Sequence, residues 1–274
     1  MTAPDPSRPA AGRPLAGRVA LVTGVSRRVG IGLAVARRLA ALGAGLFVTS
    51  WTAHDREQPW GADPGGLDAV LAELGGGDAP GVGRVEHLEA DFQDPEAPDR
   101  VMAAAVEAFG HVDILVCNHA RSSAGALGEL TAVELDATLA VNTRAVLLLV
   151  QVFAARHDGR PGGRVVLFSS GQHLGPMPGE LAYAASKGAL VEVTASLADA
   201  LADRGITVNT INPGPTDTDY VDQATRERVA RRFPAGRWGA PDDAARLVAW
   251  LCTDDAAWVT GQVINSEGGF RRFG

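Results

Sequence analysis

Short apolar runs alternate along this chain with longer segments in which apolar residues recur every three or four positions. The short runs predict buried strands at 19–22, 45–49, 85–88, 113–116, 165–168, 207–211 and 262–264. The helical spacing predicts helices over 31–42, 95–109, 133–156 and 183–203. Strands and helices that alternate in this way predict the α/β class, with a single doubly wound parallel sheet and helices on both faces.

The alternation continues from Val19 to Ile264 without a linker, which predicts a single domain over residues 15–274. Residues 1–14 are rich in Pro, Ala and Arg and lack the apolar core of a signal peptide, so we expect a disordered tail. The segment 51–66 predicts an irregular connection, and the glycines at 75–77 predict a loop.

A glycine-rich loop joins the first predicted strand to the first predicted helix, with the sequence Thr23-Gly24-Val25-Ser26-Arg27-Arg28-Val29-Gly30-Ile31-Gly32. Glycines let the backbone approach a pyrophosphate closely, and the N-terminus of the following helix favours its negative charge. A glycine cluster alone is compatible with a simple tight turn. The flanking strand and helix favour a dinucleotide site.

Tyr183 and Lys187 are spaced to lie one turn apart on the same face of a helix. An ammonium nearby is expected to lower the pKa of the phenol. Ser170 follows the predicted strand 165–168 and is expected to point into the same cleft. The Tyr-Lys spacing alone is common on solvated helix faces, but Ser170 and the glycine-rich loop favour proton transfer to and from a carbonyl or alcohol oxygen.

From about Leu15 to the C-terminus the chain resembles the short-chain dehydrogenase/reductase family, and most of all its 3-oxoacyl-carrier-protein reductases. The matching motifs occur in the family's order: Thr23-Gly24, Gly30-Ile31-Gly32, Asp91, Cys117-Asn118-His119-Ala120, Asn142, Ser170, Tyr183, Lys187, the segment Asn212 to Thr218, Thr260-Gly261 and Gly268-Gly269.

The resemblance implies a Rossmann fold and assigns roles to four catalytic residues. Tyr183 would donate the proton, Ser170 would stabilise the same oxygen, Lys187 would hold the nicotinamide ribose, and Asn142 would support a water that relays protons. Cofactor contacts are expected from Thr23, Gly24, Ser26, Arg27, Arg28, Gly30, Ile31, Gly32, Ser50, Trp51, Asp91, Phe92, Asn118, His119, Ala120, Tyr183, Lys187, Pro213, Gly214, Thr216 and Thr218.

The chain departs from the family pattern at two places. The spacer between the first two glycines has five residues, Val25 to Val29, where three are usual. Enoyl reductases of the superfamily also lengthen this loop, but space their catalytic Tyr and Lys more widely, so the four-residue step favours carbonyl reduction. His119 replaces a small Ala, and it either narrows the nicotinamide pocket, contacts substrate, or is a tolerated polar residue.

The preferred cofactor is predicted to be NADP(H). An NAD-specific site usually carries an acid after the second strand, where this chain has Ser50-Trp51 and no carboxylate before Asp55. Arg27 and Arg28 could clamp the 2′-phosphate through paired hydrogen bonds. NAD(H) remains the alternative if both arginines point to solvent.

The composition of the 274-residue chain limits the kinds of partner that it is expected to bind. A formal net charge of −7 argues against nucleic acid. Cys117 and Cys252 fit buried free thiols in a reducing compartment, and no apolar run suggests a membrane span, so we expect a cytoplasmic protein. The six histidines form no metal-binding motif, and no metal is expected.

The sequence therefore predicts a ketoreductase that acts on a small-molecule carbonyl or alcohol. A 3-oxoacyl thioester (including a carrier-bound one), a polyketide-type ketone and a cyclic secondary alcohol remain open. A mobile lid is expected over 220–238. An enoyl reductase and a non-catalytic dinucleotide sensor are the alternative functions. The apolar run Val146 to Val150 and the alanine-rich helix after Tyr183 resemble the helices that pair subunits in this family, and the resemblance implies a homo-oligomer, with a tetramer expected.

Overall fold

A parallel sheet forms the centre of the protein in the computed structural model, which describes residues 13–75 and 83–273. Residues 1–12 of the predicted tail, and Gly76 and Gly77, lie outside the described residues. The strand order is β3-β2-β1-β4-β5-β6-β7, and every pairing is parallel. The strands are β1 Val19–Val22, β2 Gly45–Ser50, β3 Val85–Glu89, β4 Ile114–Cys117, β5 Gly163–Phe168, β6 Ile206–Asn212 and β7 Val263–Asn265.

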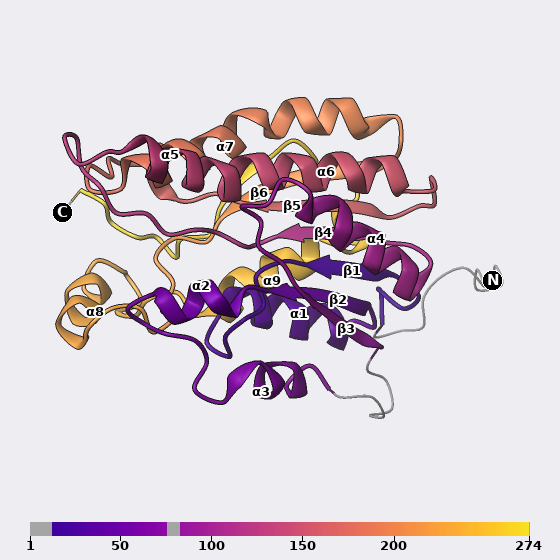
Figure 1. Cartoon of the computed structure of the whole chain (residues 1–274), viewed down its shortest axis with the longest axis horizontal. Coiled ribbons are helices and arrows are strands. Elements are labelled where there is room, and N and C mark those ends of the chain that lie inside the picture. The colour runs from indigo at the N-terminus through magenta and orange to yellow at the C-terminus, as the bar shows by residue number, and fades with distance from the viewer. Residues whose placement is uncertain (1–12, 76–82, 274) are drawn as a thin grey trace.

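Helices cover both faces of the sheet (Figure 1), which confirms the predicted class. On one face, α1 (Ile31–Ala41) packs beside α9 (Pro241–Leu251). On the other lie α4 (Ala97–Phe109), α6 (Ala145–Arg156) and α7 (Leu181–Ala202). Alternate residues of each strand enter the two cores, as the two-residue period of a strand requires. The chain builds β1 to β3 outward in one direction and β4 to β7 in the other, so the two halves diverge at a switch point between β1 and β4.

One cysteine lies in each of the two cores. Cys117 ends β4 in the core under α4, α6 and α7, and Cys252 follows α9 in the core of the other face. Both are free and buried. Burial raises the pKa of each thiol to about 12, so the predicted buried free thiols are present.

The helix predicted over 133–156 is present as one helical run, Ala132–Arg156. It consists of α5 (Ala132–Leu139), a single π-helical turn at Ala140–Arg144, and α6. The π turn, which adds a residue to one turn of the helix, was not predicted. By length and composition alone, Ala132–Arg156 could cross a membrane, yet 56% of its most apolar window is buried in the fold. Its apolar character is that of a helix covering a sheet.

The segment predicted to be irregular contains short helices. The helix α2 (Thr52–Glu57) lies within this segment, and α3 (Gly66–Ala72) begins at its last residue. The prediction is wrong for α2 because none of its residues is buried, so it carries no apolar stripe that periodicity could detect. A further short helix, α8 (Gln223–Ala230), lies in the predicted lid.

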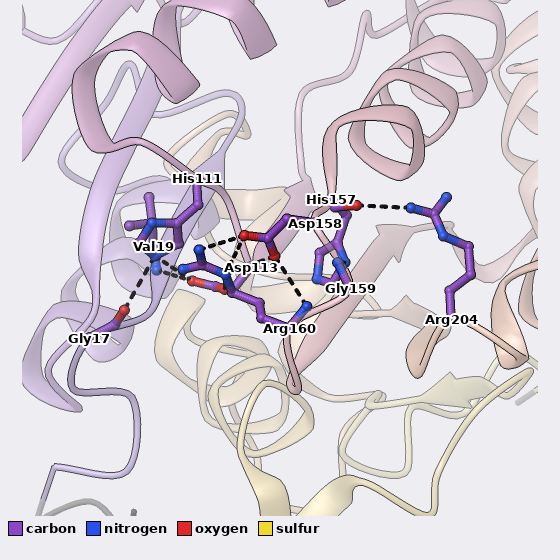
Figure 2. Close-up of polar contacts among 9 residues, drawn as sticks. All are labelled: Gly17, Val19, His111, Asp113, His157, Asp158, Gly159, Arg160 and Arg204. Carbon is purple, nitrogen blue, oxygen red and sulfur yellow. Dashed lines mark hydrogen bonds and ion pairs between the residues drawn. The ribbon is translucent and has the colours of Figure 1, made fainter.

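At the edge of the sheet opposite the strands' carboxyl ends, Asp113 joins several segments (Figure 2). Its buried carboxylate accepts a hydrogen bond of 2.7 Å from the Val19 amide. It also lies 3.2 Å from the His111 Nε2 and forms an ion pair with Arg160 at 3.7 Å. This network fixes the starts of β1 and β4 side by side and thereby helps to set where their carboxyl ends meet.

Candidate active site

The glycine-rich loop packs tightly against the loop that follows β4. Gly24 has a φ of +76°, and a Cβ there would lie 2.8 Å from the His119 Cα. The Asn118 side-chain Nδ2 donates to the carbonyls of Thr23 and Gly24, at 3.0 Å each. A Cβ on Gly32 would overlap the Gly24 carbonyl. Only glycines permit this approach.

The loop leads directly into α1, which begins at Ile31 with Gly30 as its N-cap. No side chain caps this helix, and its first turn carries no acidic residue. Its first N–H groups are therefore available to an anion. The glycine cradle and the uncapped helix end fit the pyrophosphate of a dinucleotide at the switch point.

A pocket beside this loop collects many of the residues predicted to contact the cofactor. Asp91 and Phe92 follow β3, and His119 and Ala120 follow β4. The complete lining is Trp51, His54, Ala90, Asp91, Phe92, Gln93, His119, Ala120, Arg121 and Val141. Its position at the carboxyl ends of β2, β3 and β4 suits the adenosine half of a dinucleotide. Ser50 ends β2, buried, and its hydroxyl bonds His87 at 2.8 Å.

His119 forms one wall of this pocket and is buried. Its Nδ1 lies 2.7 Å from the Thr23 hydroxyl and its Nε2 lies 3.1 Å from the Val141 carbonyl. The ring stacks on Phe92 with centroids 4.0 Å apart. Burial, together with the nearby Lys187 charge, lowers the pKa of His119 to about 3. Both ring nitrogens are engaged by protein groups, which favours the interpretation of a tolerated polar residue.

The two loop arginines lie in different surroundings. Arg28 pairs with Asp63, whose carboxylate accepts from the Arg28 Nε at 2.9 Å and from its amide at 2.8 Å. Burial opposes ionisation of Asp63, but its hydrogen bonds from Arg28 outweigh burial and lower its pKa to about 2. Sequence reasoning missed Asp63, because nothing in the local pattern links it to the loop 35 residues earlier.

Arg27 points from the glycine-rich loop toward the lid. Its Nη1 donates to the Thr218 carbonyl at 3.1 Å, and its Nε is buried without a hydrogen-bond partner among the described residues. Asp55 lies close by: burial raises its pKa, whereas a hydrogen bond with Ser26 and the charge of Arg27 lower it. Of the two arginines, Arg28 pairs with a carboxylate, whereas Arg27 forms no ion pair with one among residues 13–75 and 83–273.

Ser170, Tyr183 and Lys187 come together at the carboxyl end of β5. Lys187 is 2% exposed as a residue. Its ammonium donates to the Phe168 carbonyl at 2.9 Å and lies 5.8 Å from the centroid of the Tyr183 ring. Ser170 hydrogen-bonds the Tyr183 phenol. Burial lowers the pKa of Lys187 to about 8.

The expected lowering of the Tyr183 pKa by Lys187 is wrong in this structure. Burial raises the pKa of Tyr183 to about 12, and the negative charge of Glu180 adds to the rise, whereas the Ser170 hydrogen bond opposes it. The physical reason is desolvation: a buried phenolate loses more hydration than its neighbours restore. Tyr183 is therefore a protonated phenol at neutral pH.

Asn142 lies in the π turn and connects two parts of the site. Its Nδ2 donates to the Arg121 carbonyl and to the Ser186 hydroxyl, at 3.0 Å each, and its Oδ1 accepts from the Arg121 amide at 2.7 Å. Ser186 in turn donates to the Tyr183 carbonyl at 2.8 Å. Asn142 thus joins the loop after β4 to the first turns of α7.

The loop after β6 closes the remaining side. Gly214 has a φ of +64°, and its amide donates to the Asn212 side chain at 3.0 Å. The Thr216 hydroxyl donates to the Gly214 carbonyl at 3.2 Å. Pro213, Gly214, Thr216 and Thr218 therefore lie in or beside this loop after β6, and their contact with the cofactor stays a prediction.

An aromatic cluster connects the lid to the segment after β2. The Tyr220 ring contacts Trp238 and Trp60 edge to face, with centroid distances of 6.1 and 6.3 Å. Sequence reasoning missed Trp60, which lies in an irregular stretch 160 residues before Tyr220. Its contribution appears only in the folded chain.

Comparison with known proteins agrees with this geometry. Residues 24–271 match the family model described as Enoyl-(Acyl carrier protein) reductase. An uncharacterized oxidoreductase of Bacillus subtilis, YjdA, is 41% identical over 93% of this chain and 97% of its own. A short-chain dehydrogenase from Burkholderia cenocepacia, solved in complex with NADP, has a TM-score of 0.81 at 38% identity, over 93% of this chain and 98% of its own.

A third similar protein is the reductase LugOII, described as promiscuous and as catalysing keto-reduction at C1 during lugdunomycin biosynthesis. Its structure has a TM-score of 0.81 at 33% identity, over 93% of this chain and 98% of that one. The chain belongs to the short-chain dehydrogenase/reductase family, and it is an NAD(P)-dependent oxidoreductase with a Rossmann fold.

Proposed function

We propose that the protein is an NADP(H)-dependent ketoreductase, which interconverts a ketone and a secondary alcohol. The observation that carries the proposal is the meeting of Ser170, protonated Tyr183 and buried Lys187 beside a glycine cradle. LugOII, a relative of similar fold, is described as a ketoreductase. Its description supports reduction of a ketone and leaves the substrate class open.

The four catalytic residues have distinct tasks in the proposed reaction. The bound cofactor supplies the hydride that is added to the carbonyl carbon. The Tyr183 hydroxyl donates its proton to the carbonyl oxygen, and the Ser170 hydroxyl stabilises the negative charge that develops there. Lys187 holds the ribose and returns a proton toward Tyr183, and Asn142, as the family resemblance implies, supports a water that relays protons to Lys187.

NADP(H) is the cofactor that we propose. No carboxylate follows β2 directly, and two arginines, Arg27 and Arg28, lie in the glycine-rich loop. The Burkholderia cenocepacia relative was solved with NADP. NAD(H) use remains the weaker alternative.

Replacing Tyr183 by Phe tests the proposed function. Loss of a general acid typically costs about 10²–10⁴-fold, so kcat for ketone reduction should fall by that factor while NADPH affinity stays unchanged. Tyr220 is the only other tyrosine of the chain, and Tyr220→Phe is the matched control, expected to keep its proton-transfer activity. A Tyr183→Phe enzyme with more than about a tenth of wild-type kcat, chemistry being rate-limiting, would exclude this role.

Enoyl reduction is the second candidate, because the matching family model carries that description. The four-residue step from Tyr183 to Lys187 argues for carbonyl reduction instead. A ketone and an α,β-unsaturated thioester of equal length, each offered with NADPH, separate the two. Faster oxidation of NADPH with the unsaturated thioester would replace our proposal.

The protein is further proposed to act as a cytoplasmic homotetramer on a small-molecule carbonyl, with a carrier-bound substrate compatible. Leu147 and Leu148 of α6 are only half-buried in the single chain, whereas the neighbouring Leu149 and Val150 fill the core. A half-exposed apolar helix face of this kind suits contact with a second subunit.

A further inference from the structure

The end of the chain forms a strap, residues 266–273, across the loops that follow β5 and β6. The Ser266 amide donates to the Asn212 carbonyl at 2.8 Å, and the Arg271 amide donates to the Arg232 carbonyl at 3.0 Å. The Phe270 ring packs on Phe233 with centroids 5.0 Å apart. The strap is thus tied to the end of β6 and to the lid.

The Arg272 side chain reaches from the strap to the loop that begins at Ser170. Its guanidinium lies against Gly171, where an added Cβ would overlap Nη2 and lie 2.8 Å from Nη1. A Cβ on Gly175 would lie 2.9 Å from the Arg272 Cδ. Two glycines therefore form a cradle for this side chain, and the first of them is bonded directly to Ser170.

An ion pair with Glu267 holds Arg272 in this cradle. The two side chains are 17% and 10% exposed. The Glu267 carboxylate also accepts from the Asn212 Nδ2 at 2.8 Å, and a Cβ on Gly214 would lie 2.9 Å from the Glu267 Cα. One largely buried ion pair thus joins the loop that carries Ser170 to the loop that carries Pro213 and Gly214.

We propose that Arg272 is a positioning residue of the reaction, which holds Gly171 and thereby aims the Ser170 hydroxyl. This inference rests on the proposed function, because it gives Arg272 a task only if Ser170 stabilises the carbonyl oxygen. A hydroxyl stabilises a developing charge only when it is held in the right place beforehand. Small displacements of such a group reduce the rate strongly.

Arg272→Met tests the positioning role, with Arg271→Met as the matched control. The control removes the same charge from the neighbouring residue, whose side chain is exposed. We expect kcat for ketone reduction to fall by about tenfold in Arg272→Met, with the NADPH dissociation constant and the ketone KM within about threefold of wild type. Equal kcat values in the two variants, or a fall in NADPH affinity that parallels kcat, would overturn the proposal.

Gly171→Ala is an independent test of the same contact, because the added methyl group must displace the Arg272 guanidinium from its place against Gly171. If it acts through Arg272, the double variant Gly171→Ala/Arg272→Ala loses no more kcat than Arg272→Ala alone. If the kcat losses of the two single variants multiply in the double variant, the proposal is contradicted. If the wild-type protein reduces no ketone, the proposed function fails, and the positioning role falls with it. The same variants then show by thermal unfolding whether the Gly171–Arg272 contact itself exists.

Discussion

We expect the preference for NADPH over NADH to depend on the two arginines of the glycine-rich loop, Arg27 and Arg28. Arg27→Ala, and Arg28→Ala combined with Asp63→Asn so that no buried carboxylate is left unpaired, should each weaken NADPH use. A hydrogen bond to a charged group is worth about 1.5–3 kcal/mol, so kcat/KM for NADPH should fall accordingly while that for NADH changes little. Steady-state kinetics with both cofactors measure this.

Arg56→Ala, on the exposed surface of α2, serves as the control and should leave both cofactors unaffected. Equal losses for NADPH and NADH would show that the arginines shape the loop rather than bind a phosphate. A wild-type enzyme that prefers NADH would likewise contradict the proposal that these arginines form an NADP(H) site.

His119 makes stability depend on pH. Its ordinary pKa of 6.5 is lowered to about 3 in the folded chain, so between these values the unfolded state binds a proton that the folded state does not. The free energy of unfolding should therefore fall as pH drops below about 6.5, by up to about 1.4 kcal/mol per pH unit for this group. Urea titrations at pH 7, 6, 5 and 4 measure it.

His119→Asn should remove this contribution, so that its stability falls less steeply with acid than that of wild type. His173→Asn, at an exposed position after Ser170, should keep the wild-type slope. Identical slopes for wild type and His119→Asn would show that the ring is not kept neutral by burial.

At the residue scale, sequence reasoning succeeded where a motif is local and failed where a partner is distant. The spacing of Tyr183 and Lys187 placed both in one cluster with Ser170, because a helix fixes residues four apart. The partners Asp63 and Glu267 lie far along the chain from Arg28 and Asn212. The sign of the Tyr183 pKa shift also escaped prediction, because desolvation depends on the packed surroundings rather than on spacing.

Among the elements, the segment after β2 is expected to hold the lid through Trp60. An edge-to-face aromatic pair contributes about 0.5–1.5 kcal/mol, so loss of the contact with Tyr220 in Trp60→Ala should raise the ketone KM by about two- to tenfold and leave kcat little changed. Trp258→Ala, at a position 99% exposed, is the matched control. An unchanged KM for Trp60→Ala would mean that the lid closes without this contact.

Periodicity predicted the long elements well and the short or interrupted ones poorly. The strand β1 was predicted with its observed limits, and α1 ended one residue earlier than predicted. The helix α2 escaped prediction because it buries no side chain. The π turn around Asn142 escaped because it shifts the backbone without changing which residues are apolar.

The whole molecule is expected to assemble through α6 and α7. Light scattering at micromolar concentration should give about four times the chain mass of 28.4 kDa, and Leu148→Arg should reduce it, because a charge on an apolar contact face is costly to bury. Leu127→Arg, in a loop where the side chain is 88% exposed, should leave the mass unchanged. A wild-type monomer would remove the assembly proposal.

The core is divided into two layers, one on each face of the sheet, and the cysteine in each layer can report on the opening of that layer. Thiol reagents react with the thiolate, and burial withholds that form from both Cys117 and Cys252, so labelling has to wait for local opening. The two thiols belong to opposite layers. Labelling of Cys117 alone would mean that the helices α4, α6 and α7 separate from the sheet while α9 stays packed on it. Labelling of both cysteines at one rate would mean that the helices on the two faces separate from the sheet in a single step.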